Sequence, residues 1–279
     1  MEETLVLKKT NLIIAVLSIL LIVSLAILFK FSITFDSFSE FQKKNELKLL
    51  ADNLAADHEG SIYGIRQFLI TSSYLAEQSI ADKKTCEIIL QKVSVVYPYF
   101  LNVGMTDKEG NVICSGVNVS NKINISNDDD FKEAHETNSF AVSGYRISKI
   151  TGRPSVRFLQ PVTLEGNFNG VLFVSFAVEW LNGFSSSFDL PSGTVISKFD
   201  KDGVLFMRYP NPLVWSGTDQ SDSVFFETIK QKKEGFQIIE GLDGKKRMYY
   251  FRPIYHDGKI HAYIAVGSKI DKLSSSLGF

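Results

Sequence analysis

The 279-residue sequence has almost no net charge and few of the residues that build metal or catalytic sites. Lys and Arg together number 30 against 31 Asp and Glu, with no evident basic face, which argues against nucleic acid as a partner. The four histidines have no metal-ligand spacing, and neither a phosphate-binding glycine loop nor a hydrolase motif occurs. The sequence therefore predicts a protein that is not an enzyme, with no catalytic residues, metal or cofactor.

Long uncharged runs are equally scarce. The only one is Leu12–Phe29, which as a helix would span roughly 27 Å, close to the thickness of a bilayer core. Lys8 and Lys9 precede it, which favours a cytoplasmic N-terminus. A cleavable signal peptide is the alternative, but its apolar stretch is shorter and ends at small residues. We expect a cytoplasmic segment at residues 1–11 and a transmembrane anchor at residues 12–33.

Proline is absent from the next segment, where apolar residues recur at helical spacing from Glu40 to about Gln78. This pattern predicts a long stalk helix within residues 34–79. Its first half would hold a homodimer together, and its second half would lie along the rest of the chain. One long helix that covers a core is the other interpretation, and the two are compatible.

Only two cysteines occur, Cys86 and Cys114. If the chain beyond the anchor lies outside the cytoplasm, a disulfide between them is permitted. It would close a loop of 29 residues and contribute roughly 3–4 kcal/mol in the chain-entropy model. Two buried free thiols are the alternative. We favour the disulfide.

An internal repeat organises the remainder of the sequence. Four residues of the first copy recur 92 positions later: Gly152, Pro161, Gly166 and Leu181 return as Gly244, Pro253, Gly258 and Leu273. Upstream, Asp107–Gly110 returns as Asp200–Gly203 at an offset of 93. The two offsets differ by one residue, so insertions and deletions between the two matched regions almost cancel. This indicates that one small fold occurs twice in the chain.

Each copy reads as a hairpin, a short helix and three antiparallel strands. In the first copy we expect a helix from Asp128 to about Thr137, capped by Ser126 or Asn127, and strands at 140–148, 154–162 and 170–178. The last strand is apolar at nearly every position, as in a central strand covered on both faces. In the second copy the helix is Val224–Lys233, and Phe236–Glu240 replaces the first of the three strands. The fold class is α+β, with two PAS-like modules.

Several local matches occur in the order found in one family. They are Tyr97–Phe100, Asp107–Gly110, Phe131–Ala134, Thr151–Ser155, Pro191–Val195, Arg208–Pro212 and Gly241–Gly244. Over about residues 40–273 the sequence resembles the double-Cache sensor domain, the extracytoplasmic part of bacterial histidine kinases, diguanylate cyclases and chemoreceptors.

The resemblance implies a membrane-distal Cache module at 80–182, a membrane-proximal module at 183–273 and a juxtamembrane stub at 274–279. The protein would lie in the bacterial inner membrane as a single-pass protein, with most of the chain periplasmic or extracellular. It would bind a small molecule in the distal module and pass a signal across the membrane. No output domain follows Leu273, so the chain is a truncated sensor or acts through a partner. A scaffold with degenerate Cache modules is the alternative function.

Relatives typically carry an Asp-Arg-x-Tyr/Trp element before the Phe of Phe131–Ala134, whereas this sequence has Asn127–Asp130. Because the family's amino-acid motif needs that Arg, carboxylate ligands cannot be carried over. The acids beginning at Asp128 would bind an amine or a hard cation, or would form a solvated helix start. Tyr145 and Arg157 could orient a ligand, with Arg146 on the opposite strand face; alternatively, Arg157 pairs with a surface acid. We therefore predict a cationic or neutral ligand. The predicted contacts are Asp128, Asp130, Phe131, Tyr145 and Arg157.

Overall fold

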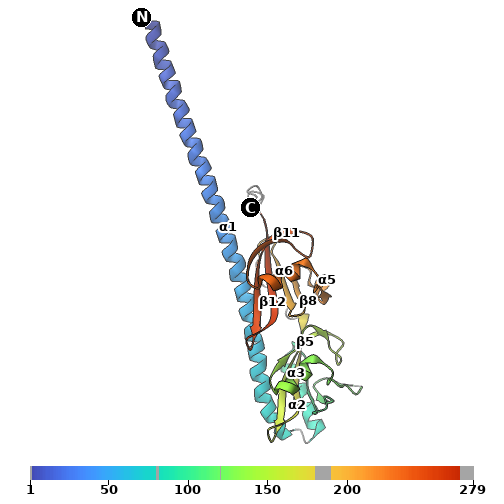
Figure 1. Ribbon diagram of the computed structural model, residues 1–279. Coiled ribbons are helices and arrows are strands. Elements are labelled where there is room, and N and C mark those ends of the chain that lie inside the picture. Colours follow the sequence, from blue (N-terminus) through green and yellow to red (C-terminus); the bar gives the residue numbers. More distant parts are fainter. Residues whose placement is uncertain (1, 80–81, 120, 180–189, 271–279) are drawn as a thin grey trace. The chain divides into compact units, whose positions relative to one another are not determined.

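The computed structural model describes residues 2–79, 82–119, 121–179 and 190–270 of the chain (Figure 1). Residues 48–269 form one compact unit, and residues before 48 belong to another. Helix α1 (Glu2–Ser79) contributes to both. Of the predicted segments, parts of the modules at 80–182 and 183–273 and all of the stub at 274–279 lie outside the described residues.

In the part of the chain whose side chains are described, no helix is long and apolar enough to cross a membrane. The side chains of residues 12–16 and 33 of the predicted anchor lie outside that part. The anchor at 12–33 therefore remains a prediction.

The first module is built on a six-stranded antiparallel sheet. Its path runs β2-β1-β6-β5-β3, with β4 also paired to β5. The strands are β1 (Phe100–Thr106), β2 (Val112–Ser115), β3 (Ala141–Val142), β4 (Arg146–Ile147), β5 (Pro154–Leu164) and β6 (Asn167–Ala177). Strand β6 lies between β1 and β5 and is buried from Gly170 to Ala177, as its apolar sequence predicts. The single strand predicted at 140–148 is replaced by the two short strands β3 and β4.

The second module repeats this arrangement. Its sheet has the order β10-β11-β12-β7-β8-β9, so the hairpin β7–β8 corresponds to β1–β2, and β12 and β11 correspond to β6 and β5. The strands are β7 (Val195–Asp200), β8 (Val204–Tyr209), β9 (Thr218–Asp219), β10 (Gly235–Glu240), β11 (Lys246–His256) and β12 (Lys259–Lys269). Strands β11 and β12 begin and end 92 positions after β5 and β6, which confirms the repeat.

One short helix covers a face of each sheet. Helix α3 (Asp129–Thr137) packs on the first sheet through Phe131 and Ala134, which join Leu159 and Phe173 in the core. Helix α6 (Val224–Lys232) buries Phe225 and Phe226 against the second sheet. The Ser223 hydroxyl caps α6 by accepting from the Phe226 N–H at 3.1 Å. A single turn, α5 (Pro212–Trp215), precedes β9.

The second half of α1 packs along both modules within the unit of residues 48–269. Lys48 donates to the Tyr250 hydroxyl at 3.2 Å, and Arg252 donates to Asp52 at 2.6 Å. Farther along, the ring of Phe68 lies 5.6 Å from that of Phe100 in the first module. Buried apolar residues of this stretch include Ala51, Leu54, Ala55, Ile62, Ile65 and Leu69.

Helix α2 (Lys83–Val96) is tied to the edge of the first sheet. Asp82 caps it by accepting from the N–H groups of Lys84 and Thr85. Cys86 on this helix forms a disulfide with Cys114 on β2, with Cα atoms 6.2 Å apart, within the usual range for such bonds. The disulfide therefore joins helix α2 to strand β2, which is the first strand on the path of this sheet.

Candidate functional site

Three consecutive acids at the start of α3 point in different directions. The side chain of Asp129 is fully exposed, at 103% of the reference value, whereas that of Asp130 is 1% exposed. Asp128, the residue before the helix, is 10% exposed at its side chain. The acids at this helix start are therefore not equivalent, and the two that face inward need partners because unpaired buried charge is costly.

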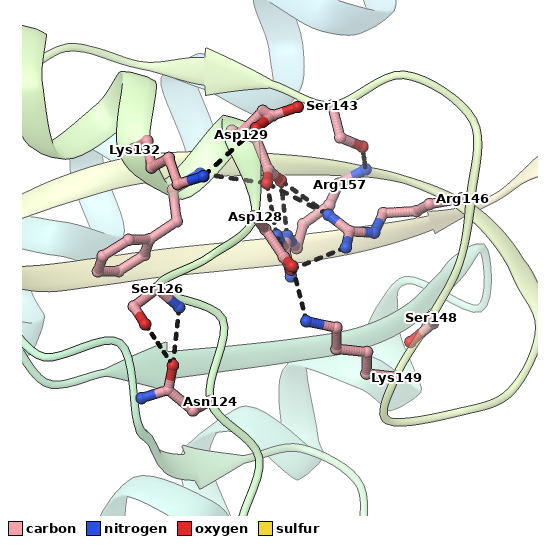
Figure 2. Close-up of polar contacts among 12 residues, drawn as sticks. Asn124, Ser126, Asp128, Asp129, Lys132, Ser143, Arg146, Ser148, Lys149 and Arg157 are labelled. Atoms are coloured by element: carbon pink, nitrogen blue, oxygen red, sulfur yellow. Dashed lines mark hydrogen bonds and ion pairs between the residues drawn. The ribbon is translucent and has the colours of Figure 1, made fainter.

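Arg157, in the middle of β5, supplies the first partner (Figure 2). Its Nε donates to Asp130 Oδ2 at 2.7 Å, and its Nη2 donates to Asp130 Oδ1 at 2.6 Å. Nη2 also donates to Asp128 Oδ2 at 2.9 Å. The Arg157 backbone N–H donates to the Ser143 hydroxyl at 2.8 Å, which holds the strand against β3. One interpretation of the sequence was that Arg157 pairs with an acid on the surface of the sheet. Arg157 does pair with acids, but the pair is buried inside the module.

Arg146, on β4, supplies the second partner. Its Nη2 donates to Asp128 Oδ2 at 2.7 Å, and its Nη1 donates to Asp130 Oδ1 at 3.2 Å. Lys149 completes the cluster by donating to Asp128 Oδ1 at 2.6 Å. The turn that presents Lys149 is fixed by Ser148, whose hydroxyl accepts from the Ile150 N–H at 3.3 Å. Figure 2 shows all three cationic side chains converging on Asp128.

The segment before α3 is anchored differently from the prediction. Asp128, rather than Ser126 or Asn127, is the residue that precedes the helix, and its side chain makes no capping hydrogen bond. The Ser126 hydroxyl donates instead to Asn124 Oδ1 at 2.6 Å. The Asp128 carboxylate is unavailable for capping because its oxygens accept from Arg146, Arg157 and Lys149.

The electrostatics of the cluster favour its ionised form. Burial alone raises the pKa of Asp128, but hydrogen bonds from Lys149 and Arg157 outweigh it, so the pKa lies below the ordinary value. Burial lowers the pKa of Arg157, and the charge and hydrogen bonds of Asp130 outweigh that effect and raise it. Three cationic side chains surround two carboxylates, so the cluster carries a formal surplus of one positive charge.

Two predicted ligand contacts have other roles in the structure. Phe131 is a core residue, 3% exposed, and its ring stands edge-on to that of Phe168 at 5.9 Å. The Tyr145 backbone N–H donates to Asp200 Oδ2 of the second module at 3.0 Å. The Phe131 backbone N–H donates to Asp130 Oδ1 at 3.1 Å, but the structure describes no interaction of the Phe131 or Tyr145 side chain with the charged cluster.

The prediction that Arg146 lies on the face away from the site is wrong. It assumed one continuous strand at 140–148, but the pairing with β5 is interrupted between β3 and β4, so side chains no longer alternate strictly. Gly144 lies in the interruption, where a Cβ would approach Asp200 Oδ2 to 2.7 Å. A glycine within a strand pattern often marks such a break, and this signal could have identified Arg146. For Lys149 we find no comparable signal.

The acids do not form a cation site of the kind considered from the sequence. Among the described residues, no group of three or more His, Cys, Asp and Glu side chains is placed to hold a metal ion. The carboxylates of Asp128 and Asp130 are instead occupied by arginine and lysine.

No protein-family model matches the sequence, and no curated protein matches it in sequence. Solved structures do match. The extracellular domain of rpHK1S-Z16, described as a histidine kinase, superposes with a TM-score of 0.73 at 19% identity, over 84% of this chain and 97% of that one. The ligand-binding domain of the Pseudomonas aeruginosa chemoreceptor PctB, solved with L-Arg, gives 0.65 at 13% identity, over 85% and 98%.

The ligand-binding domain of the Campylobacter jejuni chemoreceptor Tlp3, solved with L-valine, gives a TM-score of 0.63 at 16% identity, over 82% of this chain and 94% of that one. At these identities the likeness concerns the fold. It confirms the predicted resemblance: the chain has the fold of extracellular sensor domains of the double-Cache type.

Proposed function

We propose that this chain is the membrane-anchored, extracytoplasmic ligand-sensing part of a signal-transduction protein, and that its distal module (residues 80–182) binds a small molecule. The observation that carries the proposal is the cluster of Arg146, Arg157 and Lys149 around Asp128 and Asp130, which holds a formal surplus of one positive charge on a fold used for ligand binding. A histidine kinase, diguanylate cyclase or chemoreceptor output domain would lie beyond this chain.

The charges favour a different ligand from the one predicted by the sequence. The prediction of a cationic or neutral ligand assumed uncompensated acids at the start of α3, and that premise fails because both inward-facing acids are paired. Arg146 and Lys149 are partly exposed, at 19% and 44% of their side chains, and can donate to a carboxylate. The proposed ligand is therefore a small carboxylate, and an amino acid is one compound that carries such a group.

The exposure of α1 supports the proposed anchor and dimer. From Leu17 to Phe31 its large apolar side chains are 49–70% exposed, and Phe38 and Phe41 are each 59% exposed. Apolar surface of this kind is stable in contact with lipid or with a second helix. We propose that residues 12–33 cross a bacterial inner membrane once, and that the stalk at 34–79 pairs with a second copy of the chain.

A scaffold with degenerate Cache modules is the second candidate. It is favoured by the buried pair of Asp130 and Arg157, in which both carboxylate oxygens accept from the guanidinium group of the protein itself. A site that satisfies its own charges needs no ligand for stability.

Thermal unfolding of the full chain in detergent, with and without added compounds, tests the proposal. A binder stabilises the native state by about 2.7 kcal/mol at a ligand concentration of 100 Kd. We expect some of the twenty L-amino acids or simple carboxylates to raise Tm, and amines such as putrescine to have no effect. Arg146→Met should abolish the shift, and the control Arg153→Met, an exposed arginine paired with Glu179, should retain it.

Two outcomes would contradict the proposal. Stabilisation by amines alone would restore the cationic ligand predicted from the sequence. The absence of any shift across amino acids, carboxylates and amines would favour the scaffold.

A further inference from the structure

A second charged cluster lies in the proximal module, on the sheet face that α6 covers. Phe199 on β7 and Tyr249 on β11 belong to the core under α6. Ser197 lies two residues from Phe199 on the same strand, and Arg247 two residues from Tyr249, so both share this face. Arg208 on β8 pairs across the sheet with Ser197. Two arginines are thus brought to one side of the sheet, 2% and 4% exposed.

These arginines share one carboxylate, that of Asp243. Arg247 donates to it from both terminal nitrogens, at 2.6 and 2.8 Å. Nη2 of Arg208 lies 3.9 Å from Asp243 Oδ1, too far for a hydrogen bond. Two buried guanidinium groups against one carboxylate leave a formal surplus of one positive charge.

Hydrogen-bond donors are also in surplus. Among the described residues, Arg208 donates one hydrogen bond, from Nη1 to the Ser197 hydroxyl at 2.9 Å. Nε of Arg247 is buried and has no partner. A guanidinium group offers five N–H donors, and leaving them unpaired in the interior costs stability. Burial accordingly lowers the pKa of Arg208, and the nearby charge of Arg247 acts in the same direction.

Aromatic residues fix the arrangement. The guanidinium of Arg208 stacks on the ring of Trp215 in α5, with its central carbon 4.7 Å from the ring centre. Stacking occupies the face of the guanidinium and leaves its N–H edge free for an acceptor. Tyr249 on β11 is paired with Gly267 on β12, and its ring occupies the space that a Cβ at position 267 would need. The Tyr249 hydroxyl lies 3.4 Å from Nη1 of Arg247.

The proximal cluster is not a repeat of the distal one. At the repeat offset of 92, Tyr249 replaces Arg157, and in the matching nine-residue helices Phe225 replaces Asp130. The distal arginines have two carboxylates between them, whereas the proximal arginines have one. The surplus of cationic donors in the second module therefore comes from positions other than those that form the distal cluster.

We propose that the proximal module has its own ligand site, in which Arg208 and Arg247 bind a small monocarboxylate beside Trp215. A carboxylate matches the forked N–H edge of a guanidinium, and a single negative charge neutralises the surplus. A dianion would reverse the charge of a buried site and is disfavoured. This site is additional to the distal site and does not depend on it.

Trp215 provides a local reporter for the test. The sequence holds two tryptophans, so Trp180→Phe leaves Trp215 as the sole one. We expect sodium propionate, titrated into this full-length variant in detergent, to change its Trp emission saturably, whereas sodium chloride at equal ionic strength has no effect. Sodium sulfate and disodium succinate should bind on the order of tenfold more weakly or not at all.

Arg208→Lys, added to Trp180→Phe, should weaken propionate binding by about tenfold or more, because lysine keeps the charge but loses the forked edge. Arg252→Met removes an arginine that faces α1 from β11 and should bind propionate normally. The proposal is overturned if emission does not respond to propionate, if sulfate binds equally well, or if Arg208→Lys retains wild-type affinity. Arg208→Met, checked for folding by circular dichroism, serves as a second variant and should abolish the response.

Discussion

Arg157 and Asp130 form a two-point ion pair inside the distal module, with Nε and Nη2 of the arginine 2.7 and 2.6 Å from the two carboxylate oxygens. The pair joins the middle of β5 to the first turn of α3, 27 residues earlier in the sequence. Both partners are at least 95% buried, so neither can turn to water if the other is removed.

Removing the acid of this pair should destabilise the protein strongly. Asp130→Ala would remove the two-point partner of Arg157 and leave Asp128 as the carboxylate for both Arg157 and Arg146. The loss of one partner of a buried pair typically costs about 3–5 kcal/mol. Chemical denaturation of wild type and variant measures this loss. Asp129→Ala, at the exposed neighbouring position, should change stability by no more than about 0.5 kcal/mol. If both variants lose the same free energy of unfolding, the ion pair of Asp130 and Arg157 does not stabilise the protein.

The disulfide between Cys86 and Cys114 should be detectable and stabilising. Peptide mapping under non-reducing conditions should recover the linked peptides from exported protein. Reduction should lower the free energy of unfolding by roughly 3–4 kcal/mol, because it releases the constraint on the unfolded chain. The double variant Cys86→Ala/Cys114→Ala should be equally weakened and insensitive to reductant. Two freely alkylated thiols in the exported protein would refute the pairing.

Lys198 should make the stability of the protein depend on pH in the alkaline range. It lies under α1, donates to the Leu54 carbonyl at 3.2 Å, and burial lowers its pKa from 10.5 to about 8. The unfolded chain then holds this proton more tightly than the native state, so stability rises as the pH increases from 8 to 10.5. The full penalty, about 3 kcal/mol, applies below pH 8.

Lys198→Met should therefore raise stability at pH 7 and remove the increase between pH 8 and 10.5. Denaturation curves at several pH values check both effects. Lys201→Met, at an exposed position in the adjoining turn, is the matched control and should keep the wild-type profile. If the two variants behave alike, the Lys198 ammonium is not buried as described.

Acidification should weaken the contact of α1 with the proximal sheet. Burial, with the charges of His256 and Lys201, lowers the pKa of His261 to about 4, and His58, whose ring lies 5.7 Å away, has its pKa lowered well below 6.5 by burial and by Lys198. Both imidazoles are neutral in the native state but bind protons when unfolded. Stability should fall as the pH drops from about 6.5 toward 4.

The thermal unfolding temperature measured between pH 7 and pH 4 tests this expectation. His261→Gln should flatten the decline, since it removes one of the two groups that must stay neutral. His135→Gln, at an exposed position on α3, should leave the decline unchanged. A profile that is flat in wild type would show that both imidazoles gain protons without cost.

Much of the architecture was predictable because it depends on residues close together in sequence. The apolar run at Gly170–Val178 indicated a central strand, and β6 occupies that position. The turn residues at Asp107–Gly110 and Asp200–Gly203 indicated hairpins, and both occur. Recurrence at an offset of 92 indicated two copies of one fold, and five strands follow the same order in the two sheets.

The candidate site was predictable only in part. Asp128, Asp130 and Arg157 do lie together, but Arg146 was placed on the wrong face and Lys149 was not considered. The strand containing Arg146 breaks at Gly144, where the backbone meets Asp200, a residue of the other repeat. Periodicity within residues 140–148 contains no information about that distant contact.

Sequence patterns were enough to predict the fold class, the repeat, the succession of strands and helices, and the position of two acids at a helix start. Tertiary structure alone decided the charge of the site. Periodicity reports how a side chain is directed on its own strand or helix, whereas the net charge of a buried site is a sum over side chains from several elements. The sequence predicted a negatively charged site at Asp128, whereas the structure gives a formal charge of plus one. The reason is that β4, β5 and the turn after β4 each bring one cation to the same carboxylates.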